Sequence, residues 1–270
     1  MHTSLDDLSL ILSEIALFRA LPEHVISDIA RSAEVVSLAK GKAIYAAGDR
    51  PRALYHVMSG HLKVSVSSQD GGEKVIEILS PRQLFGVAEL FGDAPCVSSV
   101  ETVTPVVMLS VGRDSVLRAI EQEPGLSRRM LSAMAQRQSS IERDIAADCF
   151  QSGTAKVVDY LLRLAGPGIE KGRVVELELE IPKHVLAARM GFTPETLSRI
   201  FRELSDAGMI HVHGKHVTLM EAFVRTHAAR PSLRREGPVG ISRVPASSQG
   251  SAWFSRQGVG QAAAFGARGA

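Results

Sequence analysis

The sequence predicts an α+β fold with an N-terminal antiparallel β-roll (a jelly roll), a long dimerisation helix and a C-terminal winged helix-turn-helix. Three observations support this prediction. Short apolar runs broken by glycine and proline fill residues 33–111, with no helical pattern between them. After Pro124, apolar residues recur at a heptad spacing. Residues 183–220 then hold two short helical patterns joined at a glycine and followed by two alternating strands.

The N-terminal unit begins with a helical pattern and continues as the β-roll. Apolar residues at helical spacing predict one helix from about Leu5 to Leu21, which caps the roll. Asp70-Gly71-Gly72 marks a tight turn between two strands. The predicted strands include Val35–Leu38, Leu54–Met58, Leu62–Val66, Val75–Leu79 and Val97–Val103.

The middle of the chain predicts a short helix, Arg113–Glu121, and then a long helix that starts at Pro124. A heptad seam follows, and a helix that faces only solvent would not require one. The seam therefore predicts a dimer coiled coil, in which the polar Gln138 helps to fix the register. A helix packed on its own barrel would show the same spacing, and this alternative stays open. The seam residues are Leu131, Met134, Gln138, Ile141 and Ile145.

Composition excludes several classes of protein. Of 270 residues, 45% are hydrophobic, and the two cysteines are too few for a disulfide framework, an all-cysteine zinc site or a four-thiolate iron–sulfur cluster. No run of about 18 apolar residues could span a membrane, and the acidic N-terminus is unlike a secretory signal. Phosphate-binding glycine loops, nucleophile elbows, metal-ligand pairs and paired-carboxylate motifs are all missing from the sequence. We therefore expect a cytoplasmic protein that is not an enzyme.

Charge is distributed unevenly along the chain. Residues 226–270 hold six Arg and one Glu, a net charge of +5, whereas the rest of the chain holds 25 basic and 28 acidic residues, a net charge of −3. Any nucleic-acid binding must therefore come from a local face rather than from bulk charge. The basic tail, rich in Ser, Gly, Pro and Ala, is predicted to be disordered. The predicted boundaries are 1–111 for the helix and β-roll, 112–150 for the helical connection, 151–225 for the helix-turn-helix unit and 226–270 for the tail.

Residues 183–200 fit a helix-turn-helix. With Lys183 as position 1, the small Ala187 stands at position 5, where two helices approach closely, and Gly191 stands at position 9, in the turn. Thr193 is a good N-cap for the second helix, and Pro194 is a good first residue. The residues expected to pack the two helices together are Leu186, Met190, Phe192, Leu197 and Ile200.

The exposed side of the second helix carries residues that can read DNA. Arg199 can donate two hydrogen bonds to guanine, the Glu195 carboxylate can accept from cytosine, and Ser198 can meet several base edges. Thr193 and Thr196 lie beside them at the start of the helix. Glu195 and Arg199 are four residues apart, so an ion pair between them is an alternative that is compatible with base reading. The residues expected at DNA phosphates are Lys183, Arg202 and Lys215.

A strand pattern at Val174–Ile181 precedes the helix-turn-helix, and two further strands follow it. These two, Met209–His213 and His216–Met220, predict a hairpin that forms the wing, with Lys215 at its tip. The three histidines at 211, 213 and 216 lack the geometry of a metal site, so we do not expect a metal there.

Taken in this order, residues 10–224 resemble the Crp/Fnr family of bacterial transcription regulators, whose β-roll is of the cyclic-nucleotide-binding type. The segment IPKHVLAARMGFTPETLSRIFRELSDAGMIHVHGKHVTL, residues 181–219, is similar to the Fnr, Dnr and Nnr branch. In that branch a Glu-x-x-Ser-Arg pattern, matched here by Glu195, Ser198 and Arg199, reads a TTGA-type half-site. The resemblance implies a homodimeric activator that recruits RNA polymerase and binds a TTGAT–N4–ATCAA-like palindrome, with recognition helices ~34 Å apart.

The resemblance also places an effector pocket between the β-roll and the long helix. In cyclic-AMP-binding members, a Gly-Glu pair and an Arg-Ser pair hold the ribose and the phosphate. Here Val87 and Val97 replace the Glu and the Arg, and a buried phosphate without its arginine is left uncompensated. Cyclic AMP is therefore not expected. The pocket positions are Phe85, Gly86, Val87, Val97, Ser98, Met134 and Gln138.

Residues 1–30 contain no cysteine, so the family's iron–sulfur sensor is not expected either. What remains is similar to the Dnr-type regulators of denitrification, which are thought to sense nitric oxide through haem. The two cysteines, Cys96 and Cys149, have no basic neighbour in the sequence, and both are expected to be structural. A haem needs an axial ligand, for which the sensory half offers histidines outside any specific motif: His2, His24, His56 and His61.

The predicted function is thus a DNA-binding regulator of anaerobic or nitrogen-oxide (denitrification) genes that responds to a signal such as nitric oxide. Two alternatives stay open. One is a regulator of the same type that answers a cyclic nucleotide, another small ligand or no ligand. The other is a ligand-binding scaffold without DNA activity.

Overall fold

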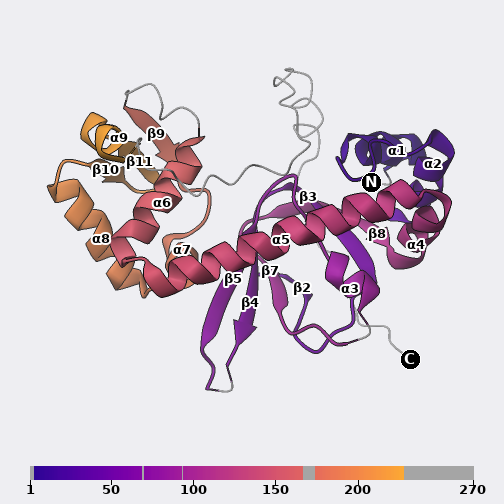
Figure 1. The fold of residues 1–270 in the computed structure, drawn as a ribbon, viewed down its shortest axis with the longest axis horizontal. Helices are drawn as coiled ribbons and strands as arrows, with labels where there is room; N and C mark the ends of the chain where they lie inside the picture. The colour runs from indigo at the N-terminus through magenta and orange to yellow at the C-terminus, as the bar shows by residue number, and fades with distance from the viewer. Residues whose placement is uncertain (1–2, 69, 93, 167–173, 228–270) are drawn as a thin grey trace.

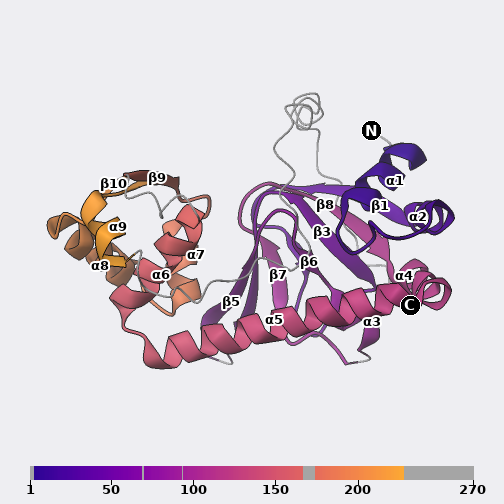
Figure 2. The same ribbon diagram turned by 45° about the horizontal axis from the view of Figure 1, so that its top comes forward.

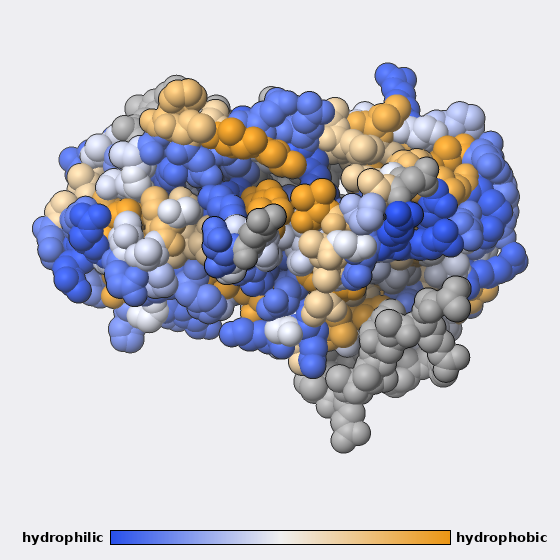
Figure 3. Space-filling model, turned by 90° about the horizontal axis from the view of Figure 1, so that it is seen from below, coloured by the Kyte–Doolittle hydropathy of each residue, from blue (hydrophilic) through white to orange (hydrophobic). Residues whose placement is uncertain are grey.

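The computed structural model describes residues 3–68, 70–92, 94–166 and 174–227, so the predictions for His2 and for the tail beyond residue 227 lie outside it. The β-roll and a smaller C-terminal unit lie beside one another along the longest axis, and helix α5 (Pro124–Phe150) runs along the roll to the smaller unit (Figures 1 and 2). The face seen in Figure 3 is mostly hydrophilic, with apolar atoms in separate patches. Among the described residues, no helix is both long enough and apolar enough to cross a bilayer.

The β-roll consists of two antiparallel four-stranded sheets, ordered β1-β8-β3-β6 and β2-β7-β4-β5, which confirms the predicted jelly roll. Between β3 and β4, Gly60 has a φ of +81°, and a Cβ there would lie 2.1 Å from the Pro105 carbonyl oxygen, so glycine is required. The strands are β1 (Ala33–Leu38), β2 (Ala43–Tyr45), β3 (Ala53–Ser59), β4 (Leu62–Ser67), β5 (Glu73–Leu79), β6 (Leu84–Phe85), β7 (Ser99–Thr102) and β8 (Val106–Gly112).

The N-terminal helical segment differs from the prediction of one helix that reaches Leu21. Helix α1 (Leu5–Glu14) ends early because Ile15 adopts an extended conformation, and a second helix, α2 (Glu23–Ala30), follows Pro22. Leu17, Phe18 and Leu21, in the turn between the two helices, are buried in the same apolar cluster as the helices themselves. Apolar spacing alone did not distinguish this packed turn from a continuous helix.

The central helices form as predicted. Helix α4 (Arg113–Gln122) is followed by α5, which has Pro124 in its first turn. Of the 27 residues of α5, only Leu126 and Met130, near its start, are buried. A short helix that was not predicted, α3 (Val87–Phe91), follows β6.

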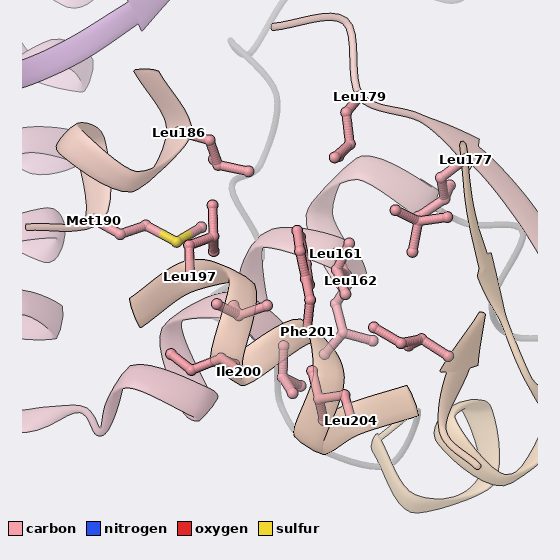
Figure 4. Packing of buried hydrophobic residues seen from close by; sticks show 14 of the residues in the cluster. Leu161, Leu162, Leu177, Leu179, Leu186, Met190, Leu197, Ile200, Phe201 and Leu204 are labelled. Atoms are coloured by element: carbon pink, nitrogen blue, oxygen red, sulfur yellow. The ribbon is translucent and has the colours of Figure 1, made fainter. Parts of the chain in front are cut away.

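The C-terminal unit is a winged helix-turn-helix, as predicted. The predicted strand at 174–181 pairs with the wing hairpin and completes a three-stranded sheet, β10-β11-β9. The buried core joins the inner face of this sheet to all four helices of the unit, and Figure 4 shows part of this packing. The elements are α6 (Gly153–Ala165), β9 (Val175–Glu178), α7 (Lys183–Met190), α8 (Pro194–Asp206), β10 (Ile210–His213), β11 (His216–Leu219) and α9 (Glu221–His227).

The C-terminal unit docks on the β-roll through apolar and ionic contacts. Val103 and Ile78, from the β-roll, pack against the core of the C-terminal unit. At the end of α5, the Asp148 carboxylate lies 3.0 Å from the ammonium of Lys74 on β5 and 3.0 Å from that of Lys156 on α6. Asp148 therefore connects α5, the β-roll and the C-terminal unit.

We expect Asp148→Asn to loosen this docking, because both lysine ammonium groups lose their carboxylate partner. Burial disfavours the ionised carboxyl, but hydrogen bonds from Lys156 and Lys74 outweigh it and hold the pKa of Asp148 below its usual value. The cluster is therefore intact at neutral pH and is lost as the pH falls through this lowered pKa. The check is the rate at which chymotrypsin cleaves after the exposed Phe150, at the junction of α5 and α6, at neutral pH. The variant should be cut severalfold faster than Glu142→Gln, which removes an exposed carboxylate from the same helix, and equal rates would contradict the prediction.

Candidate nucleic-acid interface

The turn between α7 and α8 has the geometry that the sequence predicts. Gly191 ends α7 in the left-handed region, with a φ of +74°. Thr193 caps α8 because its Oγ1 accepts a hydrogen bond from the Thr196 backbone N–H at 3.3 Å, and Pro194 is the first helical residue. Ala187 is fully buried where the helices approach, and the predicted packing residues are buried apart from the half-buried Phe192.

Thr193→Ala is expected to destabilise the C-terminal unit by about 1 kcal/mol, because the first turn of α8 loses a hydrogen-bond acceptor. Thr193→Ser keeps an oxygen at the same position and should retain most of the stability. Urea unfolding followed by circular dichroism measures both changes. Equal midpoints for the alanine variant and the wild type would show that the cap contributes nothing.

One face of α8 is exposed and polar. Glu195, Ser198, Arg199 and Arg202 are spaced three and four residues apart, which places them on one side of the helix, and all four are exposed. The opposite side of α8 anchors the helix in the core through buried residues: Leu197, Ile200, Phe201 and Leu204. A rigid helix therefore presents these four polar side chains to solvent.

Charges on this face differ from the predicted alternative. The Arg199 guanidinium pairs with Glu203, at 3.3 Å, instead of with Glu195. The alternative that predicted a Glu195–Arg199 ion pair is therefore wrong. Hydrogen bonds from the Glu195 backbone N–H and from the Thr193 side chain hold the pKa of the Glu195 carboxyl below its usual value. Glu195 is thus an ionised hydrogen-bond acceptor fixed at the start of α8, and Arg199 is a donor one turn later.

The three residues predicted to contact DNA phosphates have different surroundings in the structure. Arg202 is exposed on the polar face of α8. The Lys183 ammonium lies over the Phe201 ring, 5.6 Å from its centroid, a cation–π contact at the start of α7. Lys215, at the tip of the wing, pairs with Glu178 on β9. DNA phosphates would have to compete with Glu178 for Lys215, whereas Arg202 has no ion-pair partner among the described residues.

The heptad seam forms an uncovered apolar stripe on α5. The exposed fractions are 66% for Leu131, 36% for Met134 and 58% for Ile145. Ile141 is half-buried, and the exposed Gln138 donates a hydrogen bond to Glu142 at 3.0 Å. The alternative in which the seam packs on its own β-roll therefore does not account for this stripe.

The segment predicted to form the effector pocket of the β-roll packs against the protein's own aromatic side chains. Gly86 has a φ of +86°, and a Cβ there would lie 2.6 Å from the Ala53 carbonyl oxygen. The rings of Phe85 and Tyr55 stack at 4.8 Å, and the Tyr45 hydroxyl donates to Glu89 at 3.3 Å. Of these residues, Phe85 was predicted as a pocket position, whereas Tyr45, Tyr55 and Glu89 were not, since their contacts join segments that are distant in the sequence.

The two valines of the pocket have different environments. Val87 is buried at the start of α3, whereas the Val97 side chain is 83% exposed, so packing does not support the assignment of Val97 to the pocket. Ser98 is half-buried, and both α5 residues assigned to the pocket, Met134 and Gln138, lie on the exposed seam. Neither valine can supply the charge that a cyclic phosphate requires.

The described histidines of the sensory half, His24, His56 and His61, do not combine a free ligand atom with a haem-sized apolar slot. His24 is exposed, and the His61 Nε2 lies 2.9 Å from Glu180. Burial, with a smaller effect from Arg82, lowers the pKa of His56 to about 4, and its Nδ1 has no hydrogen-bond partner in the described structure. The cavity that borders His61 measures about 230 Å³ and is lined by charged as well as apolar side chains. These residues do not fit a haem.

The two cysteines are not alike. Cys96 is half-buried, and burial raises the pKa of its thiol, in agreement with a structural role. Cys149 is exposed near the end of α5, so the prediction that it is structural receives no support from packing.

Comparison with known proteins agrees with this architecture. A cyclic nucleotide-binding domain model matches residues 35–123, and a Crp-like helix-turn-helix domain model matches residues 155–222. A CRP-like cAMP-activated global transcriptional regulator from Mycobacterium tuberculosis is 25% identical over 82% of this chain and 99% of that protein. A cyclic AMP receptor protein from Thermus thermophilus is 27% identical over 68% of this chain and 82% of that protein.

Among solved structures, FixK2 from Bradyrhizobium japonicum superposes with a TM-score of 0.62, at 20% identity over 72% of this chain and 96% of that one. At this identity the likeness shows the fold. The relatives named above are transcriptional regulators or receptors rather than enzymes. With both characteristic domains matched in order, this chain belongs to the Crp/Fnr family of DNA-binding transcription regulators.

Proposed function

We propose that the chain acts as a cytoplasmic homodimer that activates transcription from a TTGAT–N4–ATCAA-like palindrome. The observation that carries the proposal is the exposed face of α8, where Glu195, Ser198 and Arg199 follow the Glu-x-x-Ser-Arg spacing. The Arg199 guanidinium can bond a guanine edge, while the ionised Glu195 carboxylate can accept from a cytosine amino group. Arg202, farther along the same face, is suited to a phosphate.

A second copy of the chain is the proposed occupant of the apolar stripe on α5. Three large apolar side chains stay exposed at heptad positions, Leu131, Met134 and Ile145, and parallel pairing of two such helices would bury them. Two-fold symmetry would then present two copies of α8 to the two half-sites of a palindrome. The same helix also reaches the C-terminal unit, so a signal in the β-roll can reposition α8 through it.

The test is binding of the full chain to a fluorescent duplex that carries the palindrome, measured by anisotropy at a fixed salt concentration. Specific regulators bind with dissociation constants of about 10⁻⁸–10⁻¹¹ M and prefer their site by about 10³-fold or more. A duplex of the same composition with both half-sites scrambled is the control. Equal affinity for the two duplexes would leave only non-specific binding and would contradict the proposal.

The nitric-oxide response through haem stays a prediction that rests on the family resemblance. The described histidines do not support it, and relatives named as cAMP-activated leave a nucleotide as the alternative signal. The chain purified from cells with and without haem supply should show a discrete Soret band only if haem binds. Without that band, the haem hypothesis fails, and the DNA-binding proposal is unaffected.

A further inference from the structure

The three-stranded sheet of the wing has one face in the core and one face in solvent. Val212, Val217 and Leu177 lie directly opposite one another and point into the core. Neighbouring positions along each strand point the other way, and there every side chain is exposed except the half-buried Thr218. This outer face has two rows across the strands, one nearer the turn with His213, His216 and Glu178, and one with His211, Thr218 and Glu176.

The row nearer the turn places two histidines beside an ion pair. His216 stands between His213 and Glu178, and directly opposite residues have Cβ atoms about 4.5–5.5 Å apart. The Glu178 carboxylate binds the ammonium of Lys215, the residue at the tip of the wing. The hydrogen bond from Lys215 lowers the pKa of Glu178, and the charges of Lys215 and His216 act in the same direction. Both cations are therefore close to one carboxylate.

The net charge of the outer face depends on its histidines, because histidine ordinarily changes charge between about pH 5 and pH 8. With neutral histidines, two glutamates and one lysine give the face a net charge of −1, and the lysine is engaged by Glu178. With three protonated histidines the net charge is +2, and His216 is a second cation for the Glu178 carboxylate. The same surface repels DNA phosphates in the first state and attracts them in the second.

We propose that the outer face of the wing is a proton-dependent binding surface for DNA phosphates. When the histidines are neutral, Glu178 holds Lys215 and keeps it from the DNA. When they take up protons from solvent, His216 competes for Glu178, Lys215 is released to a phosphate, and His213 adds another donor. The proposal rests on the proposed DNA-binding function, but phosphate contacts carry no sequence information, so the wing changes affinity while α8 sets the preference.

The test is anisotropy of the full chain with the palindrome and with the scrambled duplex, at about pH 8 and about pH 6 and at matched ionic strength. We expect the affinity for both duplexes to rise severalfold as the pH falls. The slope of log affinity against log salt should become steeper by about 1 for each phosphate newly contacted. A wild-type chain whose affinity does not rise overturns the proposal.

Histidine variants assign this rise to the wing. The double variant His213→Gln, His216→Gln should lose most of the rise, whereas His24→Gln should keep it, because that exposed histidine lies on α2, which packs with the β-roll. Titration of the other histidines contributes equally to all these proteins and cancels in the comparison. All the replaced side chains are exposed, and circular dichroism checks that each variant is folded. A double variant that keeps the wild-type rise overturns the proposal.

A second set of variants tests whether Glu178 holds Lys215. Glu178→Gln should raise the affinity severalfold at about pH 8, because Lys215 is then available to phosphates. Glu176→Gln removes a carboxylate from the same strand and face, but Glu176 lies opposite Thr218, so the gain should be smaller. In a Lys215→Gln chain, Glu178→Gln should no longer raise the affinity. An equal gain from Glu176→Gln, or an undiminished gain without Lys215, overturns this step.

The two duplexes also separate this proposal from sequence reading by α8. A chain that prefers the palindrome but shows the same pH dependence with and without His213 and His216 refutes the wing surface alone. A chain that binds both duplexes equally, with a rise that requires these histidines, refutes sequence reading and leaves the wing surface in place. A chain that binds neither duplex at either pH refutes both proposals.

Discussion

Arg199→Ala is expected to weaken binding of the full chain to the palindrome by about 1–3 kcal/mol per half-site and to relax the preference for guanine. The side chain stands on the exposed face of α8, where its guanidinium can reach a base edge. Its partner in the free protein is Glu203, an exposed pair four residues away, and such pairs contribute only about 0.3–0.5 kcal/mol to stability. The variant should therefore fold normally and lose DNA recognition.

The matched control is Arg225→Ala. Arg225 is also exposed and also pairs with a glutamate four residues away, Glu221, but it lies on α9, outside the polar face of α8. Anisotropy titrations with the palindrome and with duplexes changed at the guanine give both affinity and discrimination. If Arg199→Ala and Arg225→Ala bind with the same affinity and the same preference, Arg199 does not read the base.

Met134→Glu is expected to abolish dimerisation and palindrome binding together. In the proposed dimer, Met134 faces its counterpart across the α5 seam, so the substitution would bury two like charges without partners, at a cost of several kcal/mol. The wild-type side chain is partly exposed in one chain, so the monomer itself should stay folded. Sedimentation velocity reports the oligomeric state, and anisotropy reports DNA binding.

Ser139→Glu is the control for charge on the same helix. Ser139 is exposed and stands five residues after Met134, about 140° farther around the helix, away from the seam. This variant should remain a dimer and bind the palindrome. A Met134→Glu protein that is still an active dimer would place the dimer interface elsewhere.

Local sequence patterns predicted most of the fold because they describe contacts between near neighbours. Glycine and proline divided the strands, and Thr193-Pro194 located the start of α8. The same reasoning missed α2 and α3, because the turn before α2 is stabilised by burial of Phe18 in a core that distant segments complete. Lys74 and Asp148 are 74 residues apart, so no local pattern predicts their contact.

The polar face of α8 shows the same limit of prediction from local sequence, on a smaller scale. Spacing allowed Arg199 to pair with a residue four positions before it or four positions after it. The residue four positions before it, Glu195, accepts hydrogen bonds from its own backbone N–H and from the Thr193 side chain. Arg199 instead forms its ion pair with Glu203. The positions of the candidate DNA-reading residues could thus be predicted from the sequence, while their partners required the cap geometry of the folded helix.

The central claim is that two copies of α8 read an inverted repeat. Its most direct test is selection from a library of duplexes with a random central segment, using the full wild-type chain, followed by sequencing of the bound DNA. The account predicts enrichment of an inverted repeat of TTGA-type half-sites about one helical turn apart. Enrichment of a single half-site, of an unrelated sequence or of no sequence would contradict it.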